Sequence, residues 1–229
     1  MDEVTFESWW TWVQIPPAPR VSAYLYKKYM NIIKDISKRL EKVELRYNPV
    51  IIRVNKFDEE SAEKFSNQMS AAQSTGQTMI PVVIDSYGGQ VYSLMSMIAN
   101  IKASHIPVAT IVEGKAMSCG ALLFSYGASG YRFMDKHATI MIHDVSSGAR
   151  GKIEEIKADA KEGDRLNQKL YREMAANCGK EPEFFLQQIH DRSHADWYLD
   201  ADEAHNIGLT NHLRVPDLKI KIDVSYSFG

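Results

Sequence analysis

Cysteine is scarce in this chain, which holds only Cys119 and Cys178 among its 229 residues. Two cysteines cannot build the disulfide framework of a small secreted domain, and alone they cannot complete a structural zinc site. We therefore expect no metal centre and no bound cofactor. A reducing, cytoplasmic compartment is the simplest setting for such a chain.

Basic charge and long apolar runs are lacking as well. The chain has 27 Lys and Arg residues against 29 Asp and Glu residues, which gives a formal net charge of -2 at pH 7. Without a basic field, nucleic acid is not an expected partner. No apolar run approaches the roughly 18 residues that a membrane-spanning helix needs. The acidic start, MDEVTFESWW, lacks the basic-then-apolar order of a signal peptide, so we expect no membrane insertion.

Residues 1–48 are predicted to form an extension that differs from the rest of the chain. Trp9, Trp10 and Trp12 precede three prolines, a composition that favours extended backbone. Residues 22–43 then repeat apolar side chains at helical spacing. Two hypotheses remain for this extension: packing on its own domain, or docking on another chain.

Short apolar strands alternate with helices between residues 49 and 214. We expect strands at 50–54, 79–85, 107–114 and 138–143, and helices at 58–75, 91–103, 120–128, 152–177 and 182–190. Apolar strands separated by helices predict an α/β domain with a sheet covered on both faces. Residues 215–229 alternate apolar and polar side chains, which predicts a separate β-strand at the end of the chain.

Polar residues follow several of the expected strands, where open α/β sheets place their sites. Gly88 and Gly89 form a sharp turn in DSYGGQV, Ser118 precedes a helix in GKAMSCG, and His143 ends the strand TIMIH. Serine becomes a nucleophile when a base takes its proton, and histidine suits that role near neutral pH. The plainer alternatives are an ordinary turn, Ser118 as a helix cap, and Cys119 as a small apolar residue.

Four motifs in this order resemble the Clp protease proteolytic subunit (ClpP) family. They read DSYGGQV, EGKAMSCGALLFSYGASGYRFM, HATIMIHDV and DWYLDADEAHNIGLTNHL, and the resemblance covers about residues 50–214. It implies an α/β fold of the ClpP/crotonase type, a spiral of repeated ββα units with a protruding handle helix at about 152–177. Residues 49–214 would form this peptidase domain.

The resemblance also implies a catalytic triad. Ser118 matches the nucleophile, His143 the general base, and Asp196 the third member. Four other aspartates lie near enough in sequence to compete for the third role: Asp144, Asp191, Asp200 and Asp202. The last two are better suited to capping a short helix, Asp200 as the cap and Asp202 in the first turn.

Backbone groups around the serine complete the implied site. Gly89 and the amide of Cys119 match the donors of the family's oxyanion hole, and Gly88, Gln90 and Val91 match substrate-binding positions. The thiol of Cys119 would then be a bystander. A nucleophilic role for that thiol is the less favoured alternative, because Cys119 lies one residue after Ser118, the position that matches the nucleophile.

The function implied by the resemblance is a self-compartmentalising serine endopeptidase that hydrolyses peptides and unfolded proteins inside a ring chamber. It implies a homo-oligomer of two stacked heptameric rings, a tetradecamer, served by an AAA+ unfoldase. Tyr87 replaces a usual proline, Lys115 replaces a neutral residue, and residues 1–48 do not match the usual unfoldase-docking segment. The alternatives are a non-catalytic ring or scaffold subunit, a phage-type capsid maturation protease, and an acyl-CoA hydratase or isomerase of similar fold.

Overall fold

The computed structural model describes residues 49–146 and 150–216. The predicted extension over residues 1–48 and nearly all of the predicted C-terminal strand lie outside these ranges. No helix in the described ranges is both long enough and apolar enough to cross a membrane.

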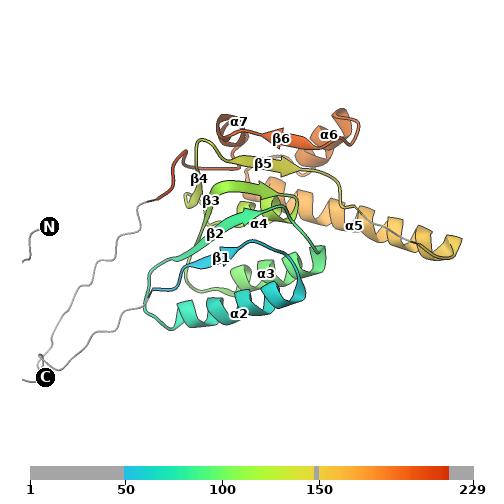
Figure 1. Cartoon of the computed structure of the whole chain (residues 1–229). Coiled ribbons are helices and arrows are strands. Elements are labelled where there is room, and N and C mark those ends of the chain that lie inside the picture. Colours follow the sequence, from blue (N-terminus) through green and yellow to red (C-terminus); the bar gives the residue numbers. More distant parts are fainter. Residues whose placement is uncertain (1–48, 147–149, 217–229) are drawn as a thin grey trace, which may run out of the picture. The chain divides into compact units, whose positions relative to one another are not determined.

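Strands and helices alternate through most of the described chain (Figure 1). The elements are β1 (Ile52–Val54), α2 (Glu59–Gln73), β2 (Ile80–Ser86), α3 (Val91–Ala103), β3 (Val108–Met117), α4 (Cys119–Ser125), β4 (Arg132–Met134), β5 (Thr139–Ile142), α5 (Ile153–Asn177), α6 (Phe184–Asp191), β6 (Trp197–Leu199) and α7 (Ala201–Asn206). The mixed α/β class predicted from the sequence is confirmed. Strands β4 and β6 were not predicted, since three residues are too few to display an alternating pattern.

The strands form one sheet in the order β1-β2-β3-β5-β6, with β4 paired to β3. All neighbouring pairs are parallel except β5 and β6, which are antiparallel. The long strand β3 serves two partners: Thr110–Val112 pairs with β4, and Lys115–Met117 pairs with β5. The ends of β3 and β5 and the start of β6 therefore meet at one edge of the molecule.

The main hydrophobic core lies between the sheet and its helices. Side chains alternate along a strand, so Val82 and Ile84 share the face that packs with helices, whereas Val83 points to the other face. On that second face Val83 joins a small cluster with Ala109, Ile111 and Phe133. None of the described helices contributes to this cluster, so the expected helical cover of both faces is found on one face only.

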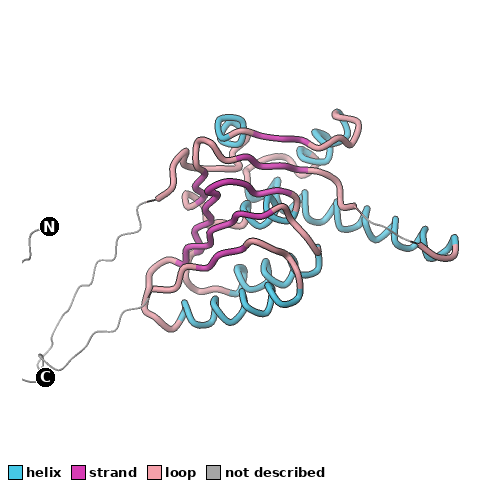
Figure 2. Tube along the Cα trace, in the orientation of Figure 1, coloured by secondary structure: helices cyan, strands magenta, loops and turns pink. Residues whose placement is uncertain are grey.

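Helix α5 begins one residue after the predicted start and ends where predicted. Its N-terminal half extends beyond the sheet (Figure 2). Ile153 there is 71% exposed and Ile156 is 42% exposed, whereas Leu166, Leu170 and Met174 in the second half are buried. The protruding handle that the resemblance implied is therefore present.

Arg132 ties the C-terminal ends of two helices together. Its guanidinium donates hydrogen bonds to the carbonyl oxygens of Ser125 at 3.4 Å, Asn177 at 2.8 Å and Gly208 at 3.0 Å. Ser125 ends α4 and Asn177 ends α5, and helix C-termini carry partial negative charge. A cation that is only 6% exposed is thus balanced by helix dipoles, and the helix that begins next to Ser118 is anchored at its far end.

Candidate active site

Ser118 occupies the sharp corner between β3 and α4. Its φ of 55° and ψ of -118° lie in a region that residues with a side chain rarely adopt. The ladder between β3 and β5 fixes this corner, because the Ser118 N–H donates to the carbonyl oxygen of Met141 at 2.8 Å. The side chain forms no capping hydrogen bond with α4, so the role of ordinary helix cap is wrong. Strain of this kind concentrates at functional sites.

His143 follows β5 and faces the serine. Its Nε2 lies 2.9 Å from Ser118 Oγ, within hydrogen-bond distance. When the ring carries its proton on Nδ1, Nε2 accepts from the serine hydroxyl, as a general base must. The peptide carbonyl of His143 accepts a hydrogen bond from the Tyr171 hydroxyl on α5, which fixes the backbone that carries the ring.

Asp196 lies on the other side of the imidazole. Its Oδ1 is 3.4 Å from His143 Nδ1, an ion-pair distance slightly longer than a good hydrogen bond. The sheet explains this proximity: β5 and β6 are antiparallel with Ile142 opposite Trp197, so the next residue on each side is His143 and Asp196. Catalytic hydrogen bonds are often long before substrate binds.

The rival aspartates have other partners. Asp144 contacts His194 at 2.6 Å, and Asp191 accepts from Gln187 at 2.6 Å. Asp200 caps α7 through a capping box, as predicted, and Asp202 lies in the first turn of that helix. In the described ranges, Asp196 is the one of the five candidates recorded in contact with the imidazole of His143.

The glycine pair packs directly against the serine. Gly88 has a φ of 105°, and a Cβ added there would lie 2.8 Å from Ser118 Cβ. Gly89 has a φ of 151°, and its Cβ would lie 2.5 Å from the carbonyl oxygen of Phe57. The N–H of Gln90 donates to that same carbonyl at 2.7 Å, which pins the turn. Only glycine fits at these two positions, and Val91 then begins α3.

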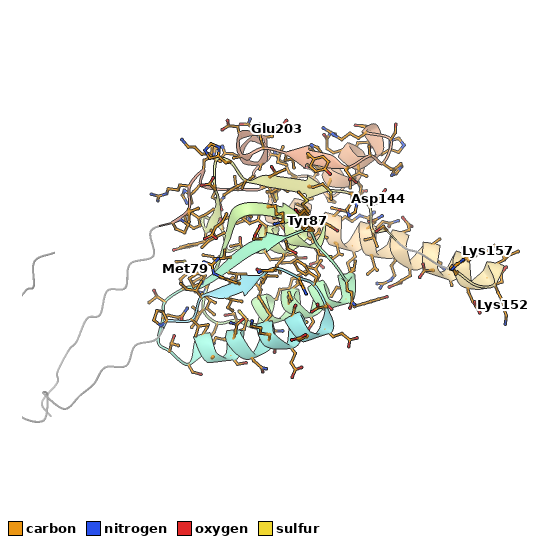
Figure 3. All side chains as sticks on the ribbon, in the orientation of Figure 1. Met79, Tyr87, Asp144, Lys152, Lys157 and Glu203 are labelled. Carbon is orange, nitrogen blue, oxygen red and sulfur yellow. The ribbon has the colours of Figure 1, made fainter. Side chains whose placement is uncertain are left out.

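Two side chains meet beside this turn, Tyr87 and Lys115, which are the positions where the sequence differs from the pattern that the resemblance implied. Tyr87 lies at the end of β2 and is exposed (Figure 3). Lys115 Nζ lies 4.5 Å from the centre of the Tyr87 ring and 2.8 Å from Asp85 Oδ1. The two substitutions thus form one cluster, which neighbours Gly88 in sequence.

Two residues that the sequence did not single out hold the segment after β5. Asn167 Oδ1 accepts from the Val145 N–H at 2.8 Å, and Asn167 Nδ2 donates to Asp144 Oδ1 at 2.9 Å. Tyr171, whose hydroxyl binds the carbonyl of His143, lies four residues further along α5 and therefore on the same face. The sequence feature that could have identified them is their position: Asn167 and Tyr171 are polar side chains next to the apolar stripe of a long helix.

The thiol of Cys119 is buried and protonated. The side chain is 1% exposed, its Sγ donates to the Gly89 carbonyl at 3.3 Å, and burial raises its pKa to about 11. At pH 8 only about one thiol in a thousand would be ionised, and the thiolate is the reactive form. The nucleophilic alternative for Cys119 is therefore disfavoured.

We expect Cys119 to resist iodoacetamide in the native protein. Both cysteines have burial-raised pKa values of about 11, so intact mass after treatment at pH 7.5 should show no adduct. Reactivity should appear only as pH approaches that value or after unfolding, and a urea-treated sample serves as the positive control. Rapid alkylation of native Cys119 would show that the thiol is ionised and accessible.

Comparison with known proteins identifies the family. The Clp protease family model matches residues 33–216. The match covers the greater part of the chain and includes the corner at Ser118, the imidazole of His143 and the loop of Asp196. With this match and the mixed α/β fold together, the protein belongs to the Clp protease family.

Proposed function

We propose that this chain is a serine endopeptidase that cleaves peptides and unfolded proteins through Ser118, His143 and Asp196. The observation that carries the proposal is the 2.9 Å contact between His143 Nε2 and Ser118 Oγ at a strained strand-to-helix corner. A serine and a histidine in this arrangement are the working pair of acyl-transfer enzymes.

The reaction would follow from this geometry. Ser118 Oγ attacks the scissile carbonyl carbon while His143 Nε2 takes the hydroxyl proton. The tetrahedral intermediate collapses, the C–N bond breaks, and His143 returns the proton to the leaving amine. Water then attacks the acyl-enzyme with His143 again as base, which releases the second product and restores Ser118. Asp196 orients the imidazole and stabilises its protonated form.

The oxyanion would be held by the backbone N–H groups of Gly89 and Cys119. The Cys119 N–H is the first of α4, where helix N-terminal amides favour negative charge. Donors of this kind are worth about 2.7–4 kcal/mol each in other hydrolases. An extended substrate would lie along Gly88, Gln90 and Val91 and add a strand through backbone contacts.

Assembly into two stacked heptameric rings is the second part of the proposal. Family membership supports a ring, and the exposed apolar residues Ile153 and Ile156 on the projecting half of α5 offer a surface for a second subunit. A chamber of this kind would admit unfolded chains from an AAA+ partner in the cytosol. Residues 1–48 do not match the family's usual unfoldase-docking segment, so a standard unfoldase is not assumed to be that partner.

Turnover and particle size, measured together, test the proposal. The purified full-length protein should elute at the size of a multi-subunit ring and hydrolyse an unstructured fluorogenic peptide. A ring without turnover would favour the scaffold alternative. Heat released on titration with coenzyme A would favour the acyl-CoA alternative, and we expect none.

A further inference from the structure

A contact outside the triad connects the two segments that carry His143 and Asp196. His194 Nδ1 lies 2.6 Å from Asp144 Oδ2. Asp144 is the residue after His143, and His194 lies two residues before Asp196. The contact joins two residues that are 50 apart in sequence, and it therefore bridges the segment that carries His143 and the segment that carries Asp196.

The loop that carries His194 is conformationally strained. Ser193 has a φ of 53° and His194 a φ of 61°, both in the left-handed region. Residues with a side chain adopt that conformation only at an energetic cost. Such backbone persists where surrounding contacts hold it. Part of that support comes from the end of α6, because the Ser193 N–H donates to the His190 carbonyl at 2.8 Å and the His194 N–H donates to the Ile189 carbonyl at 3.1 Å. The Asp144 contact adds a tie to the segment that carries His143.

Helix α5 supplies the fixed end of that interaction. Asp144 uses its second oxygen, Oδ1, to accept from Asn167 Nδ2 at 2.9 Å. Asn167 also accepts from the Val145 N–H, so the segment after β5 is bound to α5 on both sides of the Asp144 carboxylate. In Figure 3, Asp144 lies beside α5. Asp144 is therefore anchored, and its contact with His194 ties the loop before Asp196 to α5.

We propose that Asp144 and His194 form a latch that positions Asp196 against His143. The proposal rests on the function proposed above. The Asp196 side chain is 48% exposed, and its contact with the imidazole is 3.4 Å long, so the triad itself holds it loosely. The latch fixes the backbone two residues away. Neither latch residue contacts the reacting atoms, and both are positioning residues.

The expected effect is on the rate of chemistry and not on substrate affinity. A misplacement of about 1 Å in a catalytic group can lower the rate by roughly 100-fold. The latch side chains are 60% and 32% exposed, so their contact contributes little to global stability. We expect His194→Ala and Asp144→Ala each to lower kcat by about 10-fold at unchanged KM.

The test combines these two variants with their double variant and two matched controls. His205 is an exposed histidine on α7, so His205→Ala should retain full activity. Asn places an amide donor near the position of the imidazole Nδ1–H and tolerates positive φ, so His194→Asn should recover most of the lost kcat. The double variant should be no slower than the slower single variant, because both remove one contact.

Two readouts separate the latch from the proposed function. The rate of reaction with a fluorophosphonate reports the activated serine, and hydrogen exchange of residues 192–199 reports the loop. We expect both single variants to react about 10-fold more slowly and to exchange faster in that loop alone. Unchanged exchange and unchanged reaction rates would overturn the latch. A wild-type protein that exchanges slowly in the loop yet never reacts would instead refute the proposed function. Faster exchange throughout the core would mean that the variant is misfolded. The test then rests on His194→Asn: recovered kcat supports the latch, and activity as low as that of His194→Ala in a folded protein overturns it.

Discussion

Ser118→Ala is expected to abolish peptide hydrolysis, with a fall in kcat of at least about 10⁴-fold. The substitution removes only Oγ, which lies 2.9 Å from His143 Nε2. That oxygen does not cap α4, so its loss leaves the helix and the sheet unchanged. His143→Ala should have a similar effect, and the double variant should be little worse than either, because the two residues act as one unit.

Turnover of a fluorogenic peptide, measured beside circular dichroism and particle size, checks this expectation. Ser129 is an exposed serine in the loop after α4, so Ser129→Ala is a matched control that should remain fully active. Retained turnover in Ser118→Ala at the wild-type rate would remove Ser118 from the mechanism. Loss of turnover in both serine variants would point to a general defect.

Gly88→Ala is expected to inactivate the enzyme while the domain remains folded. The new methyl group would lie 2.8 Å from Ser118 Cβ and 3.2 Å from Ser118 Oγ, where no room exists. Gly88 also has a φ of 105°, which an alanine adopts only with strain. Either the serine or the glycine turn must move, and a shift of about 1 Å at the nucleophile is enough to lower kcat by roughly 100-fold.

Gly130→Ala provides the matched control for this prediction. Gly130 has a φ of 82°, so alanine is strained there too, but nothing lies within 4 Å of its added Cβ. Both variants should lose about 1 kcal/mol of stability through backbone strain, Gly88→Ala should lose more because of its clash with Ser118, and only Gly88→Ala should lose activity. Equal activity in the two variants would mean that the glycine turn does not confine the serine.

The sequence singled out Ser118 and His143 more clearly than it singled out Asp196. Ser118 stood out because it lies between small residues just before an expected helix, and His143 because it is a polar residue at the end of an expected apolar strand. Asp196 rested on resemblance, with four other aspartates nearby. What decides among them is the antiparallel register of β5 and β6, with Ile142 opposite Trp197. Register between distant strands is a tertiary property, and the three residues of β6 show no pattern from which to predict it.

Two further features could not be predicted either, because both depend on tertiary structure: the contact between Asp144 and His194, and the absence of helices from the second face of the sheet in the described residues. The latch joins Asp144 to His194, which lies in a loop where Ser193 and His194 both have a positive φ. A serine and a histidine in a sequence do not predict a positive φ. Helical cover on both faces was expected from continuous apolar strands, yet in the described chain the second face holds only a small strand cluster. The bounds of long helices with a clear apolar period were predicted more accurately: α3 spans the predicted 91–103, and α5 ends at the predicted residue 177.

Intact mass after treatment with a fluorophosphonate tests the central claim most directly. The reagent reacts with a serine that an adjacent base has activated, and it needs no knowledge of the natural substrate. We expect one adduct per chain in the wild-type protein and none in Ser118→Ala. An assembled ring that takes up no adduct, or an adduct that persists in Ser118→Ala, would contradict the proposal that Ser118 and His143 form the catalytic pair.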